Sequence, residues 1–132
     1  MVGGLMRIHH TMLRVGNLER SLEFYTQLLK MNVLAKRDFP EGRYTIAFVG
    51  YGKEEDGALI ELTYNWDSDS YDLGTGFGHL AIQVPDVYQL CEELRAKGGR
   101  IKREPGPKKY GTKTIAFILD PDNYTIELYG ED

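Results

Sequence analysis

The sequence predicts an α+β fold built from two βαβββ modules in tandem. Residues 10–15 (HTMLRV) align with residues 79–84 (HLAIQV) at an offset of 69, and the tripeptide Ile-Glu-Leu at 60–62 recurs at 126–128, an offset of 66. The difference of three residues places a change of length in one hairpin loop. The chain has 132 residues, so each half holds about 60 and is too small to bury a good core alone. Each half is therefore expected to pack against something like itself.

The first module, residues 7–66, is predicted to run strand, helix and then three strands. Residues 8–15 alternate between apolar and polar side chains, which is the pattern of a half-buried strand. A helix is expected to begin after Asn17, a residue type favoured at helix N-caps. Its apolar stripe at helical spacing is Leu18, Leu22, Tyr25 and Leu29. The remaining strands are expected at about 33–39, 44–49 and 58–64, with a polar loop over 50–57.

The second module, residues 77–130, follows a predicted linker at 67–76 and repeats the pattern. A strand over 78–84 leads to a helix with Asp86 and Gln89 in capping-box positions, and Gly98-Gly99 ends that helix. Its apolar stripe is Val87, Leu90, Cys91 and Leu94. Three further strands are expected at about 101–104, 113–119 and 124–129, with a tight turn at 120–123 as the short counterpart of the first module's loop. Ala47-Phe48 aligns with Ala116-Phe117.

Composition and charge exclude several classes of function. A net charge of −4 and a pI near 5.4 argue against nucleic acid or an anionic membrane as a partner. The longest apolar run has five residues, so no segment is expected to span a bilayer, and the first residues are too short and weakly apolar for a signal peptide. A single cysteine cannot form an intrachain disulfide, and the expected compartment is the cytoplasm.

The repeat and the strand alternation together select a set of four metal-ligand candidates. His10 and His79 open the equivalent first strands, while Glu61 and Glu127 lie on the equivalent last strands, and all four point away from the face that meets the helix. A lone histidine on a strand is more often structural than a ligand. Two imidazoles and two carboxylates at repeat-equivalent places instead favour one divalent metal ion. His9 has the opposite strand parity and aligns with a glycine, which predicts a structural role.

At these residues the sequence resembles the vicinal oxygen chelate superfamily, and within it the glyoxalase I (lactoylglutathione lyase) family. The resemblance covers nearly the whole chain. It is carried by residues 10–15, Phe24-Tyr25, residues 60–66 (IELTYNW), residues 76–79 (GFGH) and residues 120–122 (DPD) ahead of Glu127. The resemblance implies curved sheets that enclose a metal site with His10, Glu61, His79 and Glu127 as ligands. It also implies that Arg14 and Asn65 hold the glutathione part of the substrate.

The activity implied by the resemblance is isomerisation of the methylglyoxal–glutathione hemithioacetal to S-lactoylglutathione, a detoxification of methylglyoxal. Glu127 is implied as the base that moves the proton, with Glu61 as its near-symmetric counterpart. The metal is implied to be Ni²⁺, favoured because compact relatives with short loops prefer it, with Zn²⁺ or Co²⁺ as alternatives. The resemblance further implies a homodimer in which His10 and Glu61 of one chain meet His79 and Glu127 of the other.

Two alternatives share the fold. One is an Fe(II) dioxygenase or thiol transferase of the same superfamily, which uses two histidines and one glutamate, so the fourth ligand argues against it. The other is a metal-free small-molecule binding module, which does not need the four ligands. The sequence leaves open the native metal, the thiol cosubstrate, and whether sites form within or between chains.

Departures from the family pattern are local. Lys30 and Asn123 stand where the family usually has glycine, and a lysine in left-handed backbone would cost on the order of 1 kcal/mol. Thr75 occupies a place where some longer relatives carry an arginine for glutathione. Nearby candidates for anion binding are Arg103, Lys108, Lys109 and Lys113, of which at least two are expected to be solvated loop residues.

Overall fold

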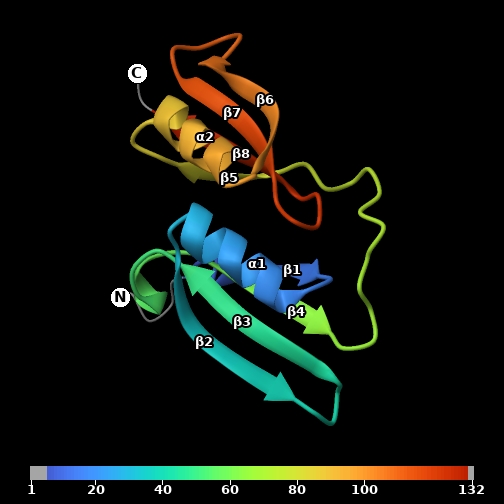
Figure 1. Ribbon diagram of the computed structural model, residues 1–132. Helices are drawn as coiled ribbons and strands as arrows, with labels where there is room; N and C mark the ends of the chain where they lie inside the picture. The colour runs from blue at the N-terminus through green and yellow to red at the C-terminus, as the bar shows by residue number, and fades with distance from the viewer. Residues whose placement is uncertain (1–5, 131–132) are drawn as a thin grey trace. The chain divides into compact units, whose positions relative to one another are not determined.

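The computed structural model describes residues 6–130, which form two compact units divided between Tyr71 and Asp72. The division falls inside the stretch predicted as the linker. Each unit contains its own four-stranded mixed sheet with one helix across one face (Figure 1). No helix within residues 6–130 combines the length and apolar character that crossing a membrane requires.

The first unit has the strand order β1-β4-β3-β2. β1 (His10–Val15) runs parallel to β4 (Leu59–Asn65), and β3 (Tyr44–Gly50) joins β4 to β2 (Asn32–Phe39) through antiparallel pairing. Between β1 and β2 lie helix α1 (Leu18–Glu23) and the π-helical turn η2 (Phe24–Leu28). A single 3-10 turn, η3 (Glu54–Asp56), lies in the loop between β3 and β4.

The second unit repeats this topology with the strand order β5-β8-β7-β6. β5 (Leu80–Gln83) runs parallel to β8 (Thr125–Gly130), and β7 (Thr114–Leu119) joins β8 to β6 (Arg100–Pro107) through antiparallel pairing. Helix α2 (Val87–Ala96) connects β5 to β6. The βαβββ order predicted from the repeat is therefore present in both units.

Strand alternation decides which face of each sheet is buried. On β1, Leu13 and Val15 are buried while His10, Met12 and Arg14 are exposed, and on β8 Ile126 and Leu128 are buried on either side of Glu127. Each unit has a small core between its sheet and its helix. The largest fully buried hydrophobic side chains of the first core are Val15, Tyr25, Val49 and Leu62. Those of the second core are Cys91, Leu94, Ile118, Ile126 and Leu128.

Both helices begin where the sequence predicts. The Asn17 side chain accepts a hydrogen bond from the backbone of Arg20 at 3.0 Å, and Asp86 does the same for Gln89 at 3.0 Å. The first helix differs from the prediction at its end, where Leu29 donates to the carbonyl of Phe24 at 3.1 Å, five residues back. This wider turn ends the helix before Lys30. The backbone of Lys30 is in the left-handed region, with a φ of 64°, and so is that of Asn123, with a φ of 73°.

Strand ends also differ from the prediction, because pairing partners decide them. β1 begins at His10 rather than Ile8, and β5 begins at Leu80 because its parallel ladder starts opposite Ile126. His79 therefore precedes its strand. β6 is longer than predicted and reaches Pro107 past two register shifts.

Candidate metal centre

The first histidine–glutamate pair is formed by His10 and Glu61. His10 is the first residue of β1, and Glu61 lies on the neighbouring parallel strand, where its Cα pairs with that of Met12. The His10 Nε2 lies 3.5 Å from the Glu61 Oε1. The side chains are 36% and 17% exposed, so a small ligand can reach both.

The second pair repeats this geometry. His79 immediately precedes β5, and Glu127 lies in the middle of the parallel strand β8. The His79 Nε2 lies 3.5 Å from the Glu127 Oε1, and the side chains are 42% and 15% exposed. Both units thus hold an imidazole and a carboxylate at the same separation.

A phenylalanine supports each pair, and the sequence reasoning gave it no role. Phe48 is the Cα partner of Glu61, and its ring meets that of His10 edge-on with centroids 5.2 Å apart. Phe117 holds the same place against Glu127 and His79, with ring centroids 5.3 Å apart. The alignment of residues 47–48 with 116–117 could have indicated this role, because both phenylalanines lie on the predicted strand that precedes the strand of a glutamate.

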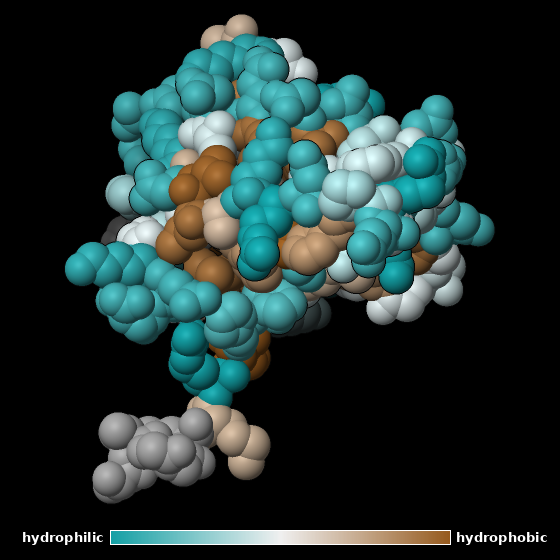
Figure 2. Space-filling view, turned by 90° about the horizontal axis from the view of Figure 1, so that it is seen from below, coloured by the Kyte–Doolittle hydropathy of each residue, from teal (hydrophilic) through white to brown (hydrophobic). Residues whose placement is uncertain are grey.

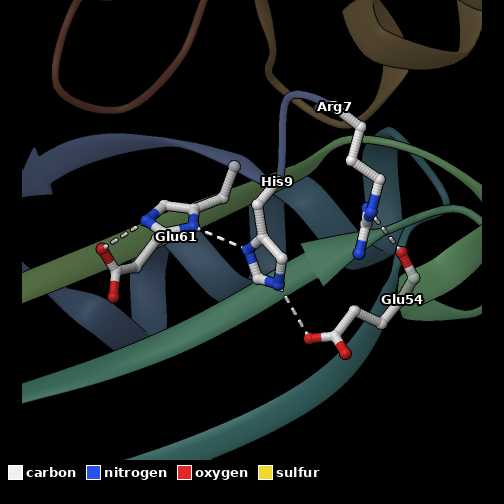
Figure 3. Close-up of polar contacts among 5 residues, drawn as sticks. Arg7, His9, Glu54 and Glu61 are labelled. Carbon is white, nitrogen blue, oxygen red and sulfur yellow. Dashed lines mark hydrogen bonds and ion pairs between the residues drawn. The ribbon is translucent and has the colours of Figure 1, made fainter. Parts of the chain in front are cut away.

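His9, which the sequence predicts to be structural, lies next to the first pair. Its Nδ1 lies 2.8 Å from the Nδ1 of His10, and its Nε2 lies 3.0 Å from the Glu54 Oε1 (Figure 3). Its backbone carbonyl accepts a hydrogen bond from the backbone of Leu59 at 3.0 Å. The sequence gave no indication of its contact with Glu54.

The donor set fits a divalent metal ion in its chemistry. Imidazole nitrogens and carboxylate oxygens are ligands of zinc, nickel and cobalt. The structure brings the four predicted ligands together as two pairs. Among residues 6–130 no group of three or more histidine, cysteine, aspartate or glutamate side chains is close enough to hold an ion. Each unit therefore holds one of the two histidine–glutamate pairs.

The predicted substrate-binding residues lie on the same strands as the ligands. Arg14 is exposed on β1, on the face of His10 and opposite Thr63. Asn65 ends β4, four residues beyond Glu61, and its Nδ2 donates to the Tyr71 hydroxyl at 2.9 Å. Its carbonyl oxygen can still accept a bond from a ligand.

Of the basic residues considered for anion binding, Arg103 has a structural role. Its guanidinium donates to the carbonyls of Gly106, Ile115 and Pro107 at 2.9 to 3.3 Å, which holds the irregular end of β6. Lys109 lies over the Tyr110 ring and Lys113 over the Tyr129 ring, with distances to the ring centroids of 5.2 and 5.9 Å.

Cys91 is the core residue that the sequence predicts. It is fully buried on α2, and this burial, followed by the negative charge of Glu104, raises the pKa of its thiol to about 11. A thiol in this state is not a nucleophile at neutral pH.

The face shown in Figure 2 is mostly hydrophilic, with hydrophobic residues visible between the hydrophilic ones. Two exposed hydrophobic side chains lie in the first unit on either side of His10 in the sequence: Ile8, 73% exposed, and Met12, 38% exposed. The surroundings of the first pair are thus apolar as well as charged.

Comparison with known proteins connects this geometry to a family. Residues 7–128 match the Glyoxalase/Bleomycin resistance protein/Dioxygenase superfamily. A probable lactoylglutathione lyase of Synechocystis is 58% identical over 123 residues, covering 93% of this chain and 94% of the relative. The lactoylglutathione lyase of Escherichia coli O157:H7 is 54% identical over 126 residues, covering 96% and 93%.

Solved structures agree with these sequence relatives. Glyoxalase I from Zea mays matches with a TM-score of 0.90 at 51% identity, covering 93% of this chain and 44% of the maize chain, so this chain spans less than half of that protein. The trypanothione-dependent glyoxalase I of Leishmania major matches with a TM-score of 0.87 at 45% identity, covering 96% and 88%. The chain therefore belongs to the glyoxalase/bleomycin resistance protein/dioxygenase superfamily and, within it, to the lactoylglutathione lyase family, as its sequence resemblance indicates.

Proposed function

We propose that this chain is a metal-dependent lactoylglutathione lyase that isomerises the hemithioacetal of methylglyoxal and glutathione to S-lactoylglutathione. The observation that carries the proposal is the duplicated histidine–glutamate pair, with the same 3.5 Å separation in both units. Its support comes from relatives above 50% identity that bear the name of this activity.

His10, Glu61, His79 and Glu127 are the residues that would hold the metal. When bound there, a divalent ion supplies Lewis acidity to the two neighbouring oxygens of the substrate. In each pair the imidazole Nε2 lies 3.5 Å from a carboxylate oxygen, so one ion could contact both donor atoms. We take nickel as the first metal to test, with zinc and cobalt as alternatives.

The proton transfer is assigned to Glu127, with Glu61 as its counterpart. In the isomerisation a carboxylate oxygen takes the proton from the carbon that bears sulfur and returns a proton to the adjacent carbon. The hydroxyl proton passes to the former ketone oxygen, so the hydroxyl carbon becomes a thioester carbonyl and the ketone becomes an alcohol. Atoms and electrons balance without any redox partner. Glu127 suits this role because it is only 15% exposed and stands beside Phe117, which limits its motion and its contact with water.

Arg14 and Asn65 are assigned to the glutathione part of the substrate. Glutathione carries carboxylates, and Arg14 offers a guanidinium on the strand face of His10. Asn65 offers an amide on the strand of Glu61. Both residues would bind ground and transition states alike, because neither is placed at the reacting carbons.

The proposed assembly is a homodimer with sites shared between chains. Within residues 6–130 each unit offers two of the four ligands, which is fewer than metal sites in proteins require, so two units must combine. The family resemblance favours combination between two chains. In this arrangement His10 and Glu61 of one chain meet His79 and Glu127 of the other. We place the enzyme in the cytoplasm, where thiols such as glutathione are kept reduced.

The test is an isomerisation assay on protein that has been stripped of metal and reloaded with Ni²⁺, Co²⁺ or Zn²⁺ separately. Hemithioacetals of methylglyoxal with glutathione and with trypanothione are offered in parallel, and thioester formation is followed by ultraviolet absorbance. Activity that depends on reloading supports the proposal. Stoichiometric metal without isomerisation of either hemithioacetal would contradict it, and oxygen consumption would point to the dioxygenase alternative.

A further inference from the structure

We propose that His9 and Glu54 form a brace that fixes the tautomer of His10 and aims its Nε2 lone pair at the metal position. The inference rests on the proposed function in one respect, since it takes His10 to be a ligand. His9 and Glu54 are positioning residues here, because they act through His10.

The contacts form one continuous chain of four side chains. Glu61 Oε1 lies 3.5 Å from His10 Nε2, the two Nδ1 atoms of His10 and His9 lie 2.8 Å apart, and His9 Nε2 lies 3.0 Å from Glu54 Oε1 (Figure 3). Each imidazole therefore uses both ring nitrogens. The chain connects the exposed 3-10 turn η3 to the candidate metal position.

The positions of the protons follow from hydrogen-bond chemistry. A carboxylate only accepts, so Glu54 favours a proton on the Nε2 of His9. A neutral His9 then has a bare Nδ1, which accepts a hydrogen bond from the Nδ1–H of His10. The Glu61 carboxylate also favours a proton on the His10 Nε2, but it lies at 3.5 Å, whereas the two Nδ1 atoms lie 2.8 Å apart, so the shorter contact decides the tautomer. With its proton on Nδ1, His10 has a lone pair on Nε2, the form that binds a metal. The second partner of a metal-bound histidine usually fixes its tautomer in this way.

The longer loop of the first unit makes the brace possible. Glu54 begins η3, its carbonyl accepts from Arg7 Nη1 at 3.4 Å, and Asp56 Oδ2 accepts from the backbone of Lys53 at 3.2 Å. The equivalent turn of the second unit is three residues shorter and has no counterpart of Glu54. The inserted residues thus bring a carboxylate to His9.

Phe48 limits the motion of both histidine rings. It contacts His10 edge-on at 5.2 Å and His9 edge-on at 6.2 Å between ring centroids, while the two imidazoles meet at 84° to each other. The edge-on packing of the three rings favours the arrangement in which the two Nδ1 atoms face each other.

The second unit provides an internal comparison. Gly78 stands where the first unit has His9, and in the described part of its unit His79 contacts Glu127 and Phe117. His79 is thus held by the glutamate and the phenylalanine alone. The two halves of the metal site differ in how firmly their histidine tautomers are fixed.

The first test is ¹⁵N NMR of the imidazole nitrogens in metal-free protein, at a pH where the rings are neutral. The wild type is expected to show His10 protonated on Nδ1 and His9 on Nε2, while Glu54→Ala should show a mixture at both. His79 should be unchanged by that substitution. Protonation of His10 on Nε2 in the wild type would overturn the brace, even if the protein binds metal.

The second test is competition for Ni²⁺ between the protein and a chelator. Glu54→Ala and His9→Leu are each expected to weaken binding by about tenfold, in the usual range for second partners of metal ligands. Glu54→Gln keeps an acceptor and should retain most of the affinity. Glu55→Ala is the matched control, because it removes the same charge from the same turn.

Combining the substitutions separates a shared brace from two independent effects. The double variant Glu54→Ala with His9→Leu should bind Ni²⁺ no more weakly than His9→Leu alone, since both changes break one chain of contacts. The proposal would be overturned if the losses of Ni²⁺ affinity in the two single variants added up in the double variant, or if Glu55→Ala lost as much affinity as Glu54→Ala. A wild type that binds none of Ni²⁺, Zn²⁺ and Co²⁺ would refute the assignment of His10 as a ligand, and the NMR result would still decide whether the brace exists.

Discussion

Phe117 on β7 lies directly opposite Glu127 on β8, and the same aromatic ring meets the imidazole of His79 edge-on. One side chain thus touches both members of a candidate metal-binding pair. Phe48 occupies the same position in the first unit. In both units the aromatic ring packs edge-on against the imidazole, and its strand pairs with the strand of the glutamate.

Replacing Phe117 by leucine should therefore loosen the pair without unfolding the unit. We expect Ni²⁺ binding to weaken by about tenfold, comparable to the loss of other groups that orient metal ligands. Chelator competition measures the change. Phe39→Leu is the control, because Phe39 stacks on Tyr44 in the unit that does not contain Phe117; an equal effect of both substitutions would contradict the role of Phe117.

Glu127→Gln should lower turnover by at least ~10², the usual range for loss of a general base, even where metal remains bound. The amide keeps the shape of the side chain but cannot take a proton at neutral pH. Metal content and kcat are measured on the same preparation, with Glu61→Gln beside it. Near-normal turnover in metal-loaded Glu127→Gln would move the base to Glu61.

Arg14→Ala should raise KM more than it lowers kcat, because it removes binding that ground and transition states share. Steady-state kinetics over a range of hemithioacetal concentrations measures both constants. Arg37→Ala serves as a matched control, since Arg37 is an exposed arginine on β2 over the Phe39 ring. A fall in kcat at unchanged KM would instead place Arg14 in the chemistry.

Mixing two inactive variants tests whether sites are shared between chains. If they are, a mixed dimer of Glu61→Ala and Glu127→Ala chains carries both lesions in one site and leaves the other intact. Co-refolding of equal amounts is then expected to restore activity, up to about a quarter of the wild-type level when chains pair at random. With sites inside single chains, every site keeps one lesion and the mixture stays inactive.

The thiol of Cys91 should resist alkylation in the native protein at pH 8 and react at once after unfolding. Burial raises its pKa to about 11, so the folded state holds the proton that the unfolded state loses near its usual value of 9.0. The corresponding contribution to stability is present below pH 9 and is lost as the pH rises toward 11. Rapid iodoacetamide labelling of folded protein at pH 8 would contradict this.

Much of the fold could be read from the sequence because the relevant signals are local. The caps at Asn17 and Asp86 and the alternation on β1 and β8 depend on residues within a few positions of each other, and duplication gave each signal twice. The ligand pairs followed from the same alternation. His79 shows the limit of predictions from strand alternation, since the parallel pairing of β5 with β8 begins one residue after it.

The features that were missed depend on contacts between distant segments. His9 meets Glu54 across 45 positions, through a loop whose path the sequence pattern does not determine. The π-helical turn that ends the first helix likewise reflects packing rather than propensity. Phe48 and Phe117 were visible in the alignment, but only strand pairing shows that each faces a glutamate.

The left-handed lysine that follows the π-helical turn bears on how the chain tolerates change. Lys30 holds a backbone conformation that disfavours a side chain by on the order of 1 kcal/mol, where glycine would fit without strain. A protein that keeps such a residue lies above the minimum stability that selection requires. Substituting glycine at position 30 is therefore expected to raise stability at a place distant in sequence from the candidate metal ligands. The gain can offset the stability that new active-site residues cost.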